Sequence, residues 1–461
     1  MKIEELKGKK ITVMGLGLHG GGIGTVCFLS EAGAKLIVTD LKLKEELESS
    51  LEKLKDLKNI EFVLGQHRKE DFTQVDMVIK NPAASWSNKY IKLALDNKIP
   101  VEIDSSLFFK LCRNKIIGVT GTKGKTTTST LIYEILKIAG KKPVQVGIGQ
   151  ISVLDKLNEL KKDSVVVFEL SSWRLSALGK YKISPQVAVI TNIYPDHLNY
   201  YKTMEDYIKD KKYICTSQKA QEACVLNWDV DVLREMEVET KAQVIKISRH
   251  KIFDGRAVYI NDDAIYLNDG IDEKKVISLY DIHLRGGYNL ENILSAIGAA
   301  FAMGVGLADI KKAVSKFSGI PHRLEFVREL DGIKYYNDTA ATIPESAISG
   351  INSFSESVVL IGGGADKNLN MAEFAKVILE KTKDVIFLKG EATNKIIVAM
   401  KIAGSMQDFI IVNSMNEAVD KARELASSGD VILLSPGSAS FGLFKNEFDR
   451  GDKFKELVKC L

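Results

Sequence analysis

Cysteine is scarce in this chain, which also lacks long apolar runs, internal repeats and a strong charge of one sign. The five cysteines lie far apart without metal-ligand spacing, which indicates reduced thiols of a cytoplasmic protein. No segment has the apolar length of a membrane span, and the N-terminal sequence MKIEELKGKK lacks the apolar core of a signal peptide. The net charge of +4 is spread along the chain and argues against a nucleic-acid or membrane partner.

What the chain does contain is typical of a globular protein. Hydrophobic residues make up 45% and charged residues 27%, a composition that allows a sizeable core. The length of 461 residues suggests two to four domains.

The most informative stretch is GVTGTKGKTTTST, at residues 118–130. The apolar pair Ile116-Ile117 precedes it and a helical pattern begins at Leu131, so the chain predicts a strand, a glycine turn and a helix. Backbone N–H groups at the start of a helix attract an anion, and the helix dipole adds to the attraction. Gly121 and Gly124 would let the backbone come close to a phosphate.

Two side chains of this stretch have the chemistry of an ATP site. Lys125 can reach terminal phosphate oxygens, and the Thr126 hydroxyl can bind Mg²⁺. Val119 stands where the usual P-loop has its first glycine, so the loop reads G-T-K-G-K-T-T. The alternative is an ordinary glycine turn before a helix, but Gly-Lys-Thr directly after a strand favours phosphate binding.

The first block, residues 1–113, has the pattern of a parallel, doubly wound sheet. An apolar strand at 11–14 is followed by residues 15–20, which fit G-x-G-x-x-G, and a second strand ends at Asp40, where dinucleotide folds contact a ribose. Further elements are predicted at 60–63, 77–79, 89–97 and 101–103. Alone, this pattern indicates NAD, yet the same loop can hold any diphosphate.

The second block, residues 114–319, carries polar residues at the ends of predicted strands. Strand 165–168 ends in Glu169-Leu170-Ser171, and strand 187–190 ends in Thr191-Asn192. Open α/β sheets bind ligands at such strand ends. Downstream we predict a lysine-rich helix at 204–216, a β-rich stretch at 243–267 with a turn at 262–263, and a helix at 289–303.

The third block, residues 320–461, is another alternation of strands and helices of domain size. A short glycine run, 362–364, again follows a strand. The predicted strands are 358–361, 385–388, 409–412 and 431–434.

These blocks and their motifs resemble the Mur ligase family, of the superfamily that includes folylpolyglutamate synthetases, over essentially the whole chain. Each motif is modest alone, but their order is highly specific: GTKGKTT (121–127), ELSSW (169–173), TNIYPDHL (191–198), YIKDK (207–211), PHRLE (321–325), NDTAAT (337–342) and SPGSASFGLFKNEFDRG (435–451). The resemblance implies an α/β protein with a Rossmann-like N-terminal domain, a central P-loop ATPase-like domain and a C-terminal Rossmann-like domain.

The resemblance also implies an ATP-dependent amide ligase of peptidoglycan precursor synthesis. A carboxylate attacks the γ-phosphate of ATP to give an acyl phosphate, and an amine then displaces phosphate. Because two anions must meet, cations have to screen them and align the attack. The branch of the family with the greatest similarity adds glutamate to UDP-muramoyl-alanine, so we expect these small molecules, ATP and two Mg²⁺ ions as ligands of a monomer.

Four residues would carry the reaction by this resemblance: Lys125, Glu169, His197 and Lys211. Thr126 and Glu169 would bind one Mg²⁺, and His197 would help to hold the second. Lys211 stands four residues after Tyr207, in the Y-x-x-x-K spacing where the family carries a carbamylated lysine that can bind or orient around Mg²⁺. A carbamate forms only from a neutral amine, so the site would have to lower the pKa of Lys211.

The resemblance assigns further nucleotide contacts beyond the loop residues Gly121, Thr122, Lys123, Gly124, Lys125, Thr126 and Thr127. Asn292 would lie near adenine, Arg323 would reach the phosphates, and Asp338 would bind the ribose. Several of these residues also have ordinary structural alternatives. His197 could be a cap or core residue, Lys211 a solvated helix lysine, Arg323 a hinge charge, and Asn292 a buried polar group that satisfies its neighbours.

The remaining assignments concern the other two substrates. The glycine loop with Gly17, Leu18 and Asp40 would hold uridine diphosphate. In the middle block, Gln150 and Ser171 would face the sugar side. Glutamate brings two carboxylates, which need a cation and neutral donors, and the matching residues are Lys367, Thr342 and Ser440.

Three positions depart from the pattern of the family. Ala340 stands where relatives often have lysine, Glu447 where they often have an aromatic residue, and Gln150 where asparagine is usual. The first two affect the amino-acid pocket. The resemblance implies D-glutamate as the substrate, and these two positions leave L-glutamate as the alternative.

Other interpretations remain at this stage. A sister ligase with another acceptor or amino acid is one, although the Asp-Asn-Pro signature of the meso-diaminopimelate ligases is not found. An NAD oxidoreductase with an accessory ATPase is a second. A third is an ATP-gated binding protein with a decayed site, which the presence of Lys125, Glu169, His197 and Lys211 disfavours.

Overall fold

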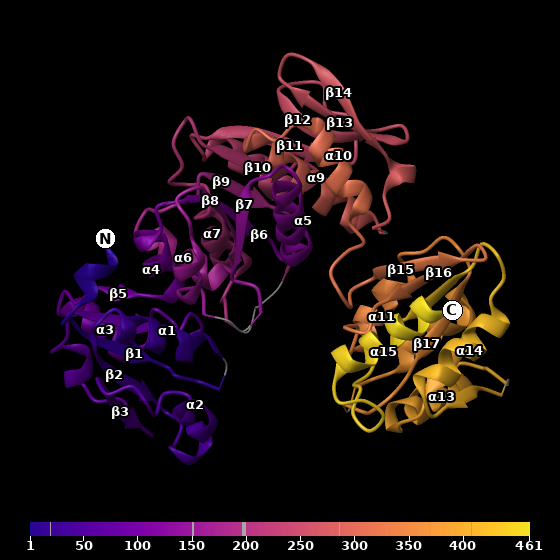
Figure 1. Ribbon diagram of the computed structural model, residues 1–461, viewed down its shortest axis with the longest axis horizontal. Helices are drawn as coiled ribbons and strands as arrows, with labels where there is room; N and C mark the ends of the chain where they lie inside the picture. Colours follow the sequence, from indigo (N-terminus) through magenta and orange to yellow (C-terminus); the bar gives the residue numbers. More distant parts are fainter. Residues whose placement is uncertain (19, 150–151, 196–199, 285, 368, 407) are drawn as a thin grey trace. The chain divides into compact units, whose positions relative to one another are not determined.

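The computed structural model describes the chain except residues 19, 150–151, 196–199, 285, 368 and 407. The described residues form an α/β fold built on three sheets, as predicted (Figure 1). They separate into two compact units, one of residues 1–277 with 291–313 and the other of residues 278–290 with 314–461. The domain boundaries after 113 and 319 stay a prediction.

The N-terminal sheet is parallel, with strand order β3-β2-β1-β4-β5. Its central strand β1 has four consecutive buried residues, which is typical of a parallel strand covered on both faces. Its strands are β1 (Lys10–Met14), β2 (Lys35–Asp40), β3 (Ile60–Leu64), β4 (Met77–Lys80) and β5 (Val101–Glu102). Its helices are α1 (Gly20–Glu31), α2 (Glu48–Glu52), α3 (Lys89–Asp96) and α4 (Asp104–Leu111).

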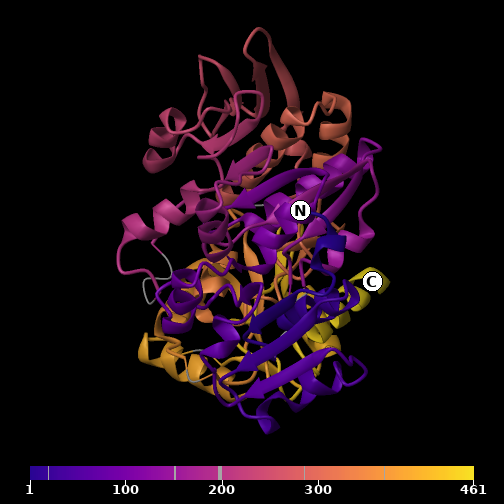
Figure 2. The same ribbon diagram turned by 90° about the vertical axis from the view of Figure 1, so that its left-hand side faces the viewer.

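The middle sheet has the strand order β14-β13-β12-β11-β10-β9-β6-β8-β7. It is parallel from β7 to β12, and the antiparallel hairpin of β12 and β13 lies toward one margin (Figures 1 and 2). The strands are β6 (Lys115–Thr120), β7 (Lys142–Val146), β8 (Ser164–Glu169), β9 (Val187–Ile190), β10 (Ala223–Asn227), β11 (Gln243–Ser248), β12 (Arg256–Asn261), β13 (Ala264–Asp269) and β14 (Glu273–Ser278). The helices are α5 (Lys125–Ile138), α6 (Ser172–Lys180), α7 (Met204–Lys212), α8 (Asp231–Glu235), α9 (Gly287–Ala302) and α10 (Leu307–Lys316).

The N-terminal and middle sheets share one apolar core within the first unit. Phe108 of α4 packs edge-to-face on Phe168 of β8, with ring centroids 5.2 Å apart. Such aromatic pairs bury a large apolar area and fix the relative orientation of the elements that carry them. Side chains at the ends of both sheets can therefore contribute to one site.

The C-terminal sheet belongs to the second unit and has the strand order β15-β16-β20-β17-β18-β19. It is parallel except for the hairpin of β15 and β16. Its strands are β15 (Glu325–Leu330), β16 (Ile333–Asn337), β17 (Val358–Gly362), β18 (Thr382–Leu388), β19 (Ile410–Val412) and β20 (Val431–Leu434). Its helices are α11 (Pro344–Ile351), α12 (Ala372–Lys381), α13 (Glu391–Ile402), α14 (Met415–Leu425) and α15 (Glu447–Cys460).

The elements predicted from the sequence are present, although the helix predicted over 204–216 ends at Lys212. Several observed strands were not predicted, among them β7, β10 and the hairpin of β15 and β16. In the described part of the chain, no helix combines the length and the apolar composition that crossing a membrane requires.

Candidate active site

The loop at 121–124 joins β6 to the start of α5, and its two glycines are needed for different reasons. Gly124 has φ +80° and caps the helix in the left-handed conformation. At Gly121, with φ +154°, an added Cβ would lie 1.9 Å from Thr191 Oγ1. The loop therefore tolerates no side chain at Gly121, and this glycine lets the backbone pack against Thr191 at the end of the neighbouring strand.

Neighbouring strand ends hold this loop in place. β6 lies between β8 and β9, so the residues after all three strands meet at one edge of the sheet. Asn192 accepts hydrogen bonds from the Thr122 N–H through its carbonyl, at 3.0 Å, and from the Lys123 N–H through its side chain, at 2.9 Å. The Thr191 hydroxyl donates to the Lys123 carbonyl at 2.7 Å.

Two lysines of the predicted site converge on the loop. Lys125, the first residue of α5, donates from Nζ to the carbonyls of Gly121 and Thr122, at 3.1 and 3.0 Å. Lys211 of α7 donates to the same Gly121 carbonyl at 2.9 Å. The structure thus brings together residues separated by 90 positions in the chain.

Lys211 is not a solvated helix lysine, because only 2% of it is exposed. Its ammonium lies 4.7 Å from the centre of the Tyr207 ring. The Tyr207 hydroxyl is 3.1 Å from Thr122 Oγ1, so the helix and the phosphate loop are also joined through these side chains.

Glu169 ends β8 and is paired in register with Val119, two residues before Gly121. Its Oε2 atom is buried and has no hydrogen-bond partner among the described residues. A buried carboxylate oxygen without a partner is costly unless a ligand or cation satisfies it.

Three other predicted site residues lie at the starts of helices. Thr126 and Thr127 lie in the first turn of α5. Ser171 caps α6, because its hydroxyl accepts a hydrogen bond from the Arg174 N–H at 3.4 Å.

Asn292, on α9, lies against Gly124 and the start of α5. It is 2% exposed, and its Oδ1 accepts a hydrogen bond from Thr128 Oγ1 at 3.3 Å. A Cβ added at Gly124 would lie 2.0 Å from the same oxygen. The close approach of α9 to the loop therefore depends on glycine at position 124.

A cavity of about 170 Å³ lies in the first unit, at the glycine loop after β1. Asp40 supports this loop, because its Oδ2 accepts from the Gly17 N–H and its Oδ1 from the Lys42 N–H, both at 3.0 Å. Leu18 is 48% exposed. Lining residues come from the glycine loop and from the ends of neighbouring elements, and they include Gly17, Gly21, Lys80, Asn81, Asp104 and Arg174.

Sequence reasoning missed the charged residues of this cavity. Arg174, from α6, donates to Asp104 at 3.1 Å. Lys80 ends β4 and is 1% exposed. For Lys80, its position at the end of a strand was a signal that the sequence offered. For Arg174, no local feature of the middle block indicated that its side chain would line a cavity in the first block.

In the second unit, two of the residues assigned to glutamate form a pair. Lys367 Nζ donates to Thr342 Oγ1 at 3.0 Å. Ser440 is 3% exposed and follows Ala439, whose backbone is bridged to Ala365 at 3.0 and 3.1 Å. The loops after β16, β17 and β20 are thereby gathered at one edge of the C-terminal sheet.

Asp338, predicted to bind ribose, is 7% exposed and holds the turn that carries Arg323. Its Oδ1 accepts from the Leu324 N–H at 3.1 Å and its Oδ2 from Ser435 Oγ at 2.7 Å. Burial raises the pKa of the Asp338 carboxyl to about 7, against the opposing effects of these hydrogen bonds and of Arg323. The neighbours of Arg323 adopt positive φ, +70° at His322 and +41° at Leu324, and Arg323 itself is exposed.

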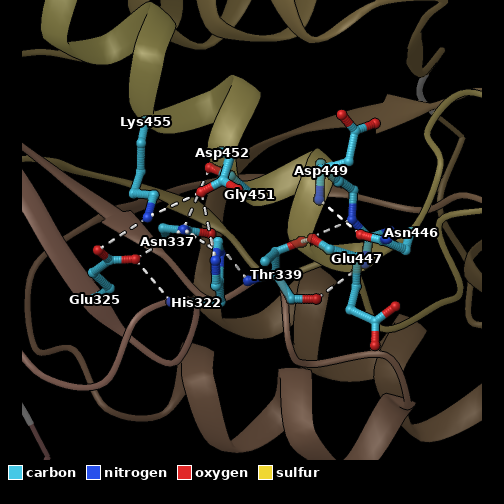
Figure 3. Close-up of polar contacts among 11 residues, drawn as sticks. His322, Glu325, Asn337, Thr339, Asn446, Glu447, Asp449, Gly451, Asp452 and Lys455 are labelled. Atoms are coloured by element: carbon cyan, nitrogen blue, oxygen red, sulfur yellow. Dashed lines mark hydrogen bonds and ion pairs between the residues drawn. The ribbon is translucent and has the colours of Figure 1, made fainter.

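Figure 3 shows how this turn is anchored. His322 Nδ1 lies 3.2 Å from Asn337 Nδ2, and Glu325 accepts from the His322 N–H at 2.8 Å. Glu447 is the first residue of α15, where the helix dipole favours a carboxylate. Its side chain extends away from His322, Glu325 and Asn337. Glu447 contributes its carbonyl to a hydrogen bond from Thr339 Oγ1 at 2.9 Å. Of the predicted site residues, His197 and Gln150 lie outside the described residues.

Comparison with known families accounts for nearly the whole chain. Residues 9–102 match the model of the Mur ligase MurD-like N-terminal domain, residues 119–300 the Mur ligase middle domain, and residues 322–437 the Mur ligase glutamate ligase domain.

Relatives and solved structures give the same result. UDP-N-acetylmuramoylalanine–D-glutamate ligase of Roseiflexus sp. (strain RS-1) is 42% identical over 99% of both chains, and that of Clostridioides difficile (strain 630) is 38% identical over 99% of this chain and 100% of the relative. The crystal structure of UDP-N-acetylmuramate–alanine ligase from Thermotoga maritima has the same fold, with a TM-score of 0.54 at 20% identity, and covers 98% of this chain and 99% of its own. The chain belongs to the Mur ligase family.

Proposed function

We propose that this protein is the ATP-dependent ligase that joins D-glutamate to UDP-N-acetylmuramoyl-L-alanine, through an acyl phosphate, in peptidoglycan precursor synthesis. Relatives named UDP-N-acetylmuramoylalanine–D-glutamate ligase match along essentially the full chain, at 35–42% identity. The match of residues 9–102 to a MurD-like domain favours a uridine diphosphate ligand there over NAD. The cytoplasm, where reduced thiols persist, is the proposed location.

The observation that carries the chemical part of the proposal is the buried, unpartnered Glu169 oxygen beside the phosphate loop. Thr126 and Glu169 supply the hard oxygen ligands that Mg²⁺ prefers. Among the described residues, no group of three or more His, Cys, Asp or Glu is placed so that it could hold a metal ion by itself. This donor set fits a Mg²⁺ ion that shares its coordination with phosphate oxygens. When bound, Mg²⁺ supplies charge neutralisation between the phosphates and the attacking carboxylate. His197 is the proposed ligand of a second ion.

The loop residues would act by binding and alignment. Gly121 to Thr127 cradle the phosphates, and Lys125 exchanges its carbonyl contacts for phosphate oxygens. Asn292 faces the start of α5 and is the proposed adenine contact. Arg323 and Asp338 are the proposed contacts of the C-terminal unit with phosphate and ribose.

Carbamylation of Lys211 is also part of the proposal. Its burial supports this modification, because desolvation favours the neutral amine that reacts with CO₂. The modified side chain would be an anion near the loop that orients Mg²⁺. The resulting loss of the ammonium would also release the Gly121 carbonyl.

The substrate contacts follow from the other two sheets. The cavity at the glycine loop, with Gly17, Leu18 and Asp40 around it, is proposed to hold the uridine diphosphate. Gln150 and Ser171 would face the sugar. The pair of Lys367 and Thr342, together with Ser440, would take the carboxylates of glutamate, so that Lys367 compensates for the lysine missing at Ala340.

One assay tests the proposal. The protein is incubated with ATP, Mg²⁺ and UDP-N-acetylmuramoyl-L-alanine against D-glutamate, L-glutamate and lysine, while phosphate release and product mass are followed. We expect phosphate and the mass of the D-glutamyl product, and no effect of NAD. Preference for L-glutamate would refute the stereochemical part, and preference for lysine would refute the whole substrate assignment.

A further inference from the structure

Lys80, the last residue of β4, is a buried cation with an unusual set of partners. Only 1% of it is exposed. Its Nζ donates to the carbonyl of Ala84 at 2.7 Å and to those of Asn81 and Pro82, both at 3.3 Å. The ammonium thus gathers three carbonyls of one short turn, residues 81–84.

Keeping an ammonium at this position is costly. Burial lowers the pKa of Lys80 to about 8, with Lys180 acting in the same direction and Asp104 and Asp210 opposing it. No carboxylate among the described residues forms an ion pair with Lys80, so backbone carbonyls compensate for its charge. An apolar residue would be the cheaper choice for stability alone. Because stability alone does not account for a buried ammonium here, we look for a role of the turn geometry in the neighbouring cavity.

The turn contributes Asn81 and Pro82 to one wall of the cavity at the glycine loop, next to Lys80 itself. The Asn81 N–H donates to the Met14 carbonyl at 2.9 Å, and Asn81 Oδ1 accepts from the Ala83 N–H at 2.9 Å. A Cβ added at Gly15 would lie 3.0 Å from Asn81 Cβ, so this wall packs directly on the glycine loop. A change in the turn would therefore change the width of the cavity.

The same turn leads to Trp86, whose ring lies close to two lysine ammonium groups. Lys80 Nζ lies 4.6 Å and Lys180 Nζ 4.5 Å from the centre of the Trp86 ring. Trp86 Nε1 donates to Ser176 Oγ of α6 at 2.9 Å. Because α6 also carries Arg174, which lines the same cavity, two parts of the cavity lining are connected through one helix.

We infer that Lys80 is a positioning residue for the UDP-linked substrate: it fixes the turn 81–84 as a preformed wall of the glycine-loop cavity. This inference rests on the proposed function, since it takes the cavity as the site of the uridine diphosphate. Lys80 itself is committed to carbonyls and acts through the backbone that it holds. Preorganised supporting residues of this kind lower the cost of ordering a site on binding.

The test compares Lys80→Met with wild type by calorimetry, with UDP-N-acetylmuramoyl-L-alanine as the titrant. Methionine keeps the apolar stem but removes the donors. We expect the Kd for this substrate to rise by about tenfold or more, while the KM for ATP changes less than about twofold. Lys80→Gln keeps two N–H donors and should recover part of the affinity. If the Met variant does not fold, the Gln variant should still bind the UDP-linked substrate more weakly than wild type, and wild-type affinity in it would overturn the inference.

Lys180→Met is the matched control, because Lys180 also contacts the Trp86 ring but donates to none of the turn carbonyls. It should bind the UDP-linked substrate as wild type does. Wild-type affinity in folded Lys80→Met, or equal weakening in both lysine variants, would overturn the inference and leave the proposed function intact. If wild type itself does not bind the UDP-linked substrate, the proposed function fails and the inference fails with it.

Discussion

Two glycines at opposite ends of α5 allow a controlled test of the phosphate loop. Gly124 and Gly140 both have positive φ, +80° and +70°. A Cβ at Gly140 meets nothing within 4 Å, whereas one at Gly124 would lie 2.0 Å from Asn292 Oδ1. Alanine at each position therefore carries a similar backbone strain. Only Gly124→Ala also adds a steric clash with Asn292 of α9.

The magnitudes follow from these contacts. The left-handed conformation costs alanine about 1–2 kcal/mol, which should be the whole effect of Gly140→Ala. At Gly124, overpacking adds about 1–3 kcal/mol, and loss of the hydrogen bond from Thr128 to the displaced Asn292 adds about 1 kcal/mol. The expected difference between the variants is about 2–4 kcal/mol, or roughly 5–15 °C in the melting temperature of a domain of this size.

Thermal unfolding and steady-state kinetics provide the two measurements. Gly140→Ala should keep the wild-type KM for ATP, because the added Cβ contacts no other residue and does not displace Asn292. Gly124→Ala should lose at least about tenfold in kcat/KM for ATP, since both the loop and Asn292 must shift. Equal melting temperatures for the two variants, with unchanged ATP kinetics in Gly124→Ala, would refute the packing argument.

Four other predictions concern single side chains. Lys125→Ala should abolish phosphate release with every amino acid because it removes the cation of the phosphate loop, and wild-type turnover would contradict the ATP site. Lys211→Ala should lose most activity and regain part of it with added short carboxylic acids, whereas full activity in CO₂-depleted buffer would exclude a carbamate. Lys367→Ala should raise the KM for glutamate roughly 10- to 100-fold, through loss of charged hydrogen bonds, and an equal rise in the KM for ATP would refute this role. The pKa of Asp338, raised to about 7, makes the folded protein bind more protons than the unfolded chain between about pH 4 and 7. Stability from this carboxyl is therefore lost as the pH rises through that window. Urea unfolding at pH 5 and pH 7 should show a smaller loss in Asp338→Asn than in wild type, and identical losses would contradict the shift.

The sequence by itself determined the features that depend on short-range geometry. The GTKGKTT loop had to join a strand to a helix, because an apolar run precedes it and a helical period follows. Glu169 and Asn192 were expected near this loop, since the carboxyl ends of parallel strands share one edge of a sheet, and both are found there. The order of the motifs was sufficient to predict the family, which the comparisons confirm.

Only the tertiary structure decided how individual side chains are used. Lys211 had the sequence neighbourhood of a solvated helix, yet packing of α7 on the phosphate loop buries its ammonium against Gly121. Asp40 is predicted to help hold the uridine diphosphate, and the fold shows in addition that both of its oxygens accept from backbone N–H groups. Lys80 and Arg174 line one cavity because the two sheets of the first unit share a core. Burial and partner choice are set by segments far apart in the chain, whereas strand and helix periodicity is set within a few residues.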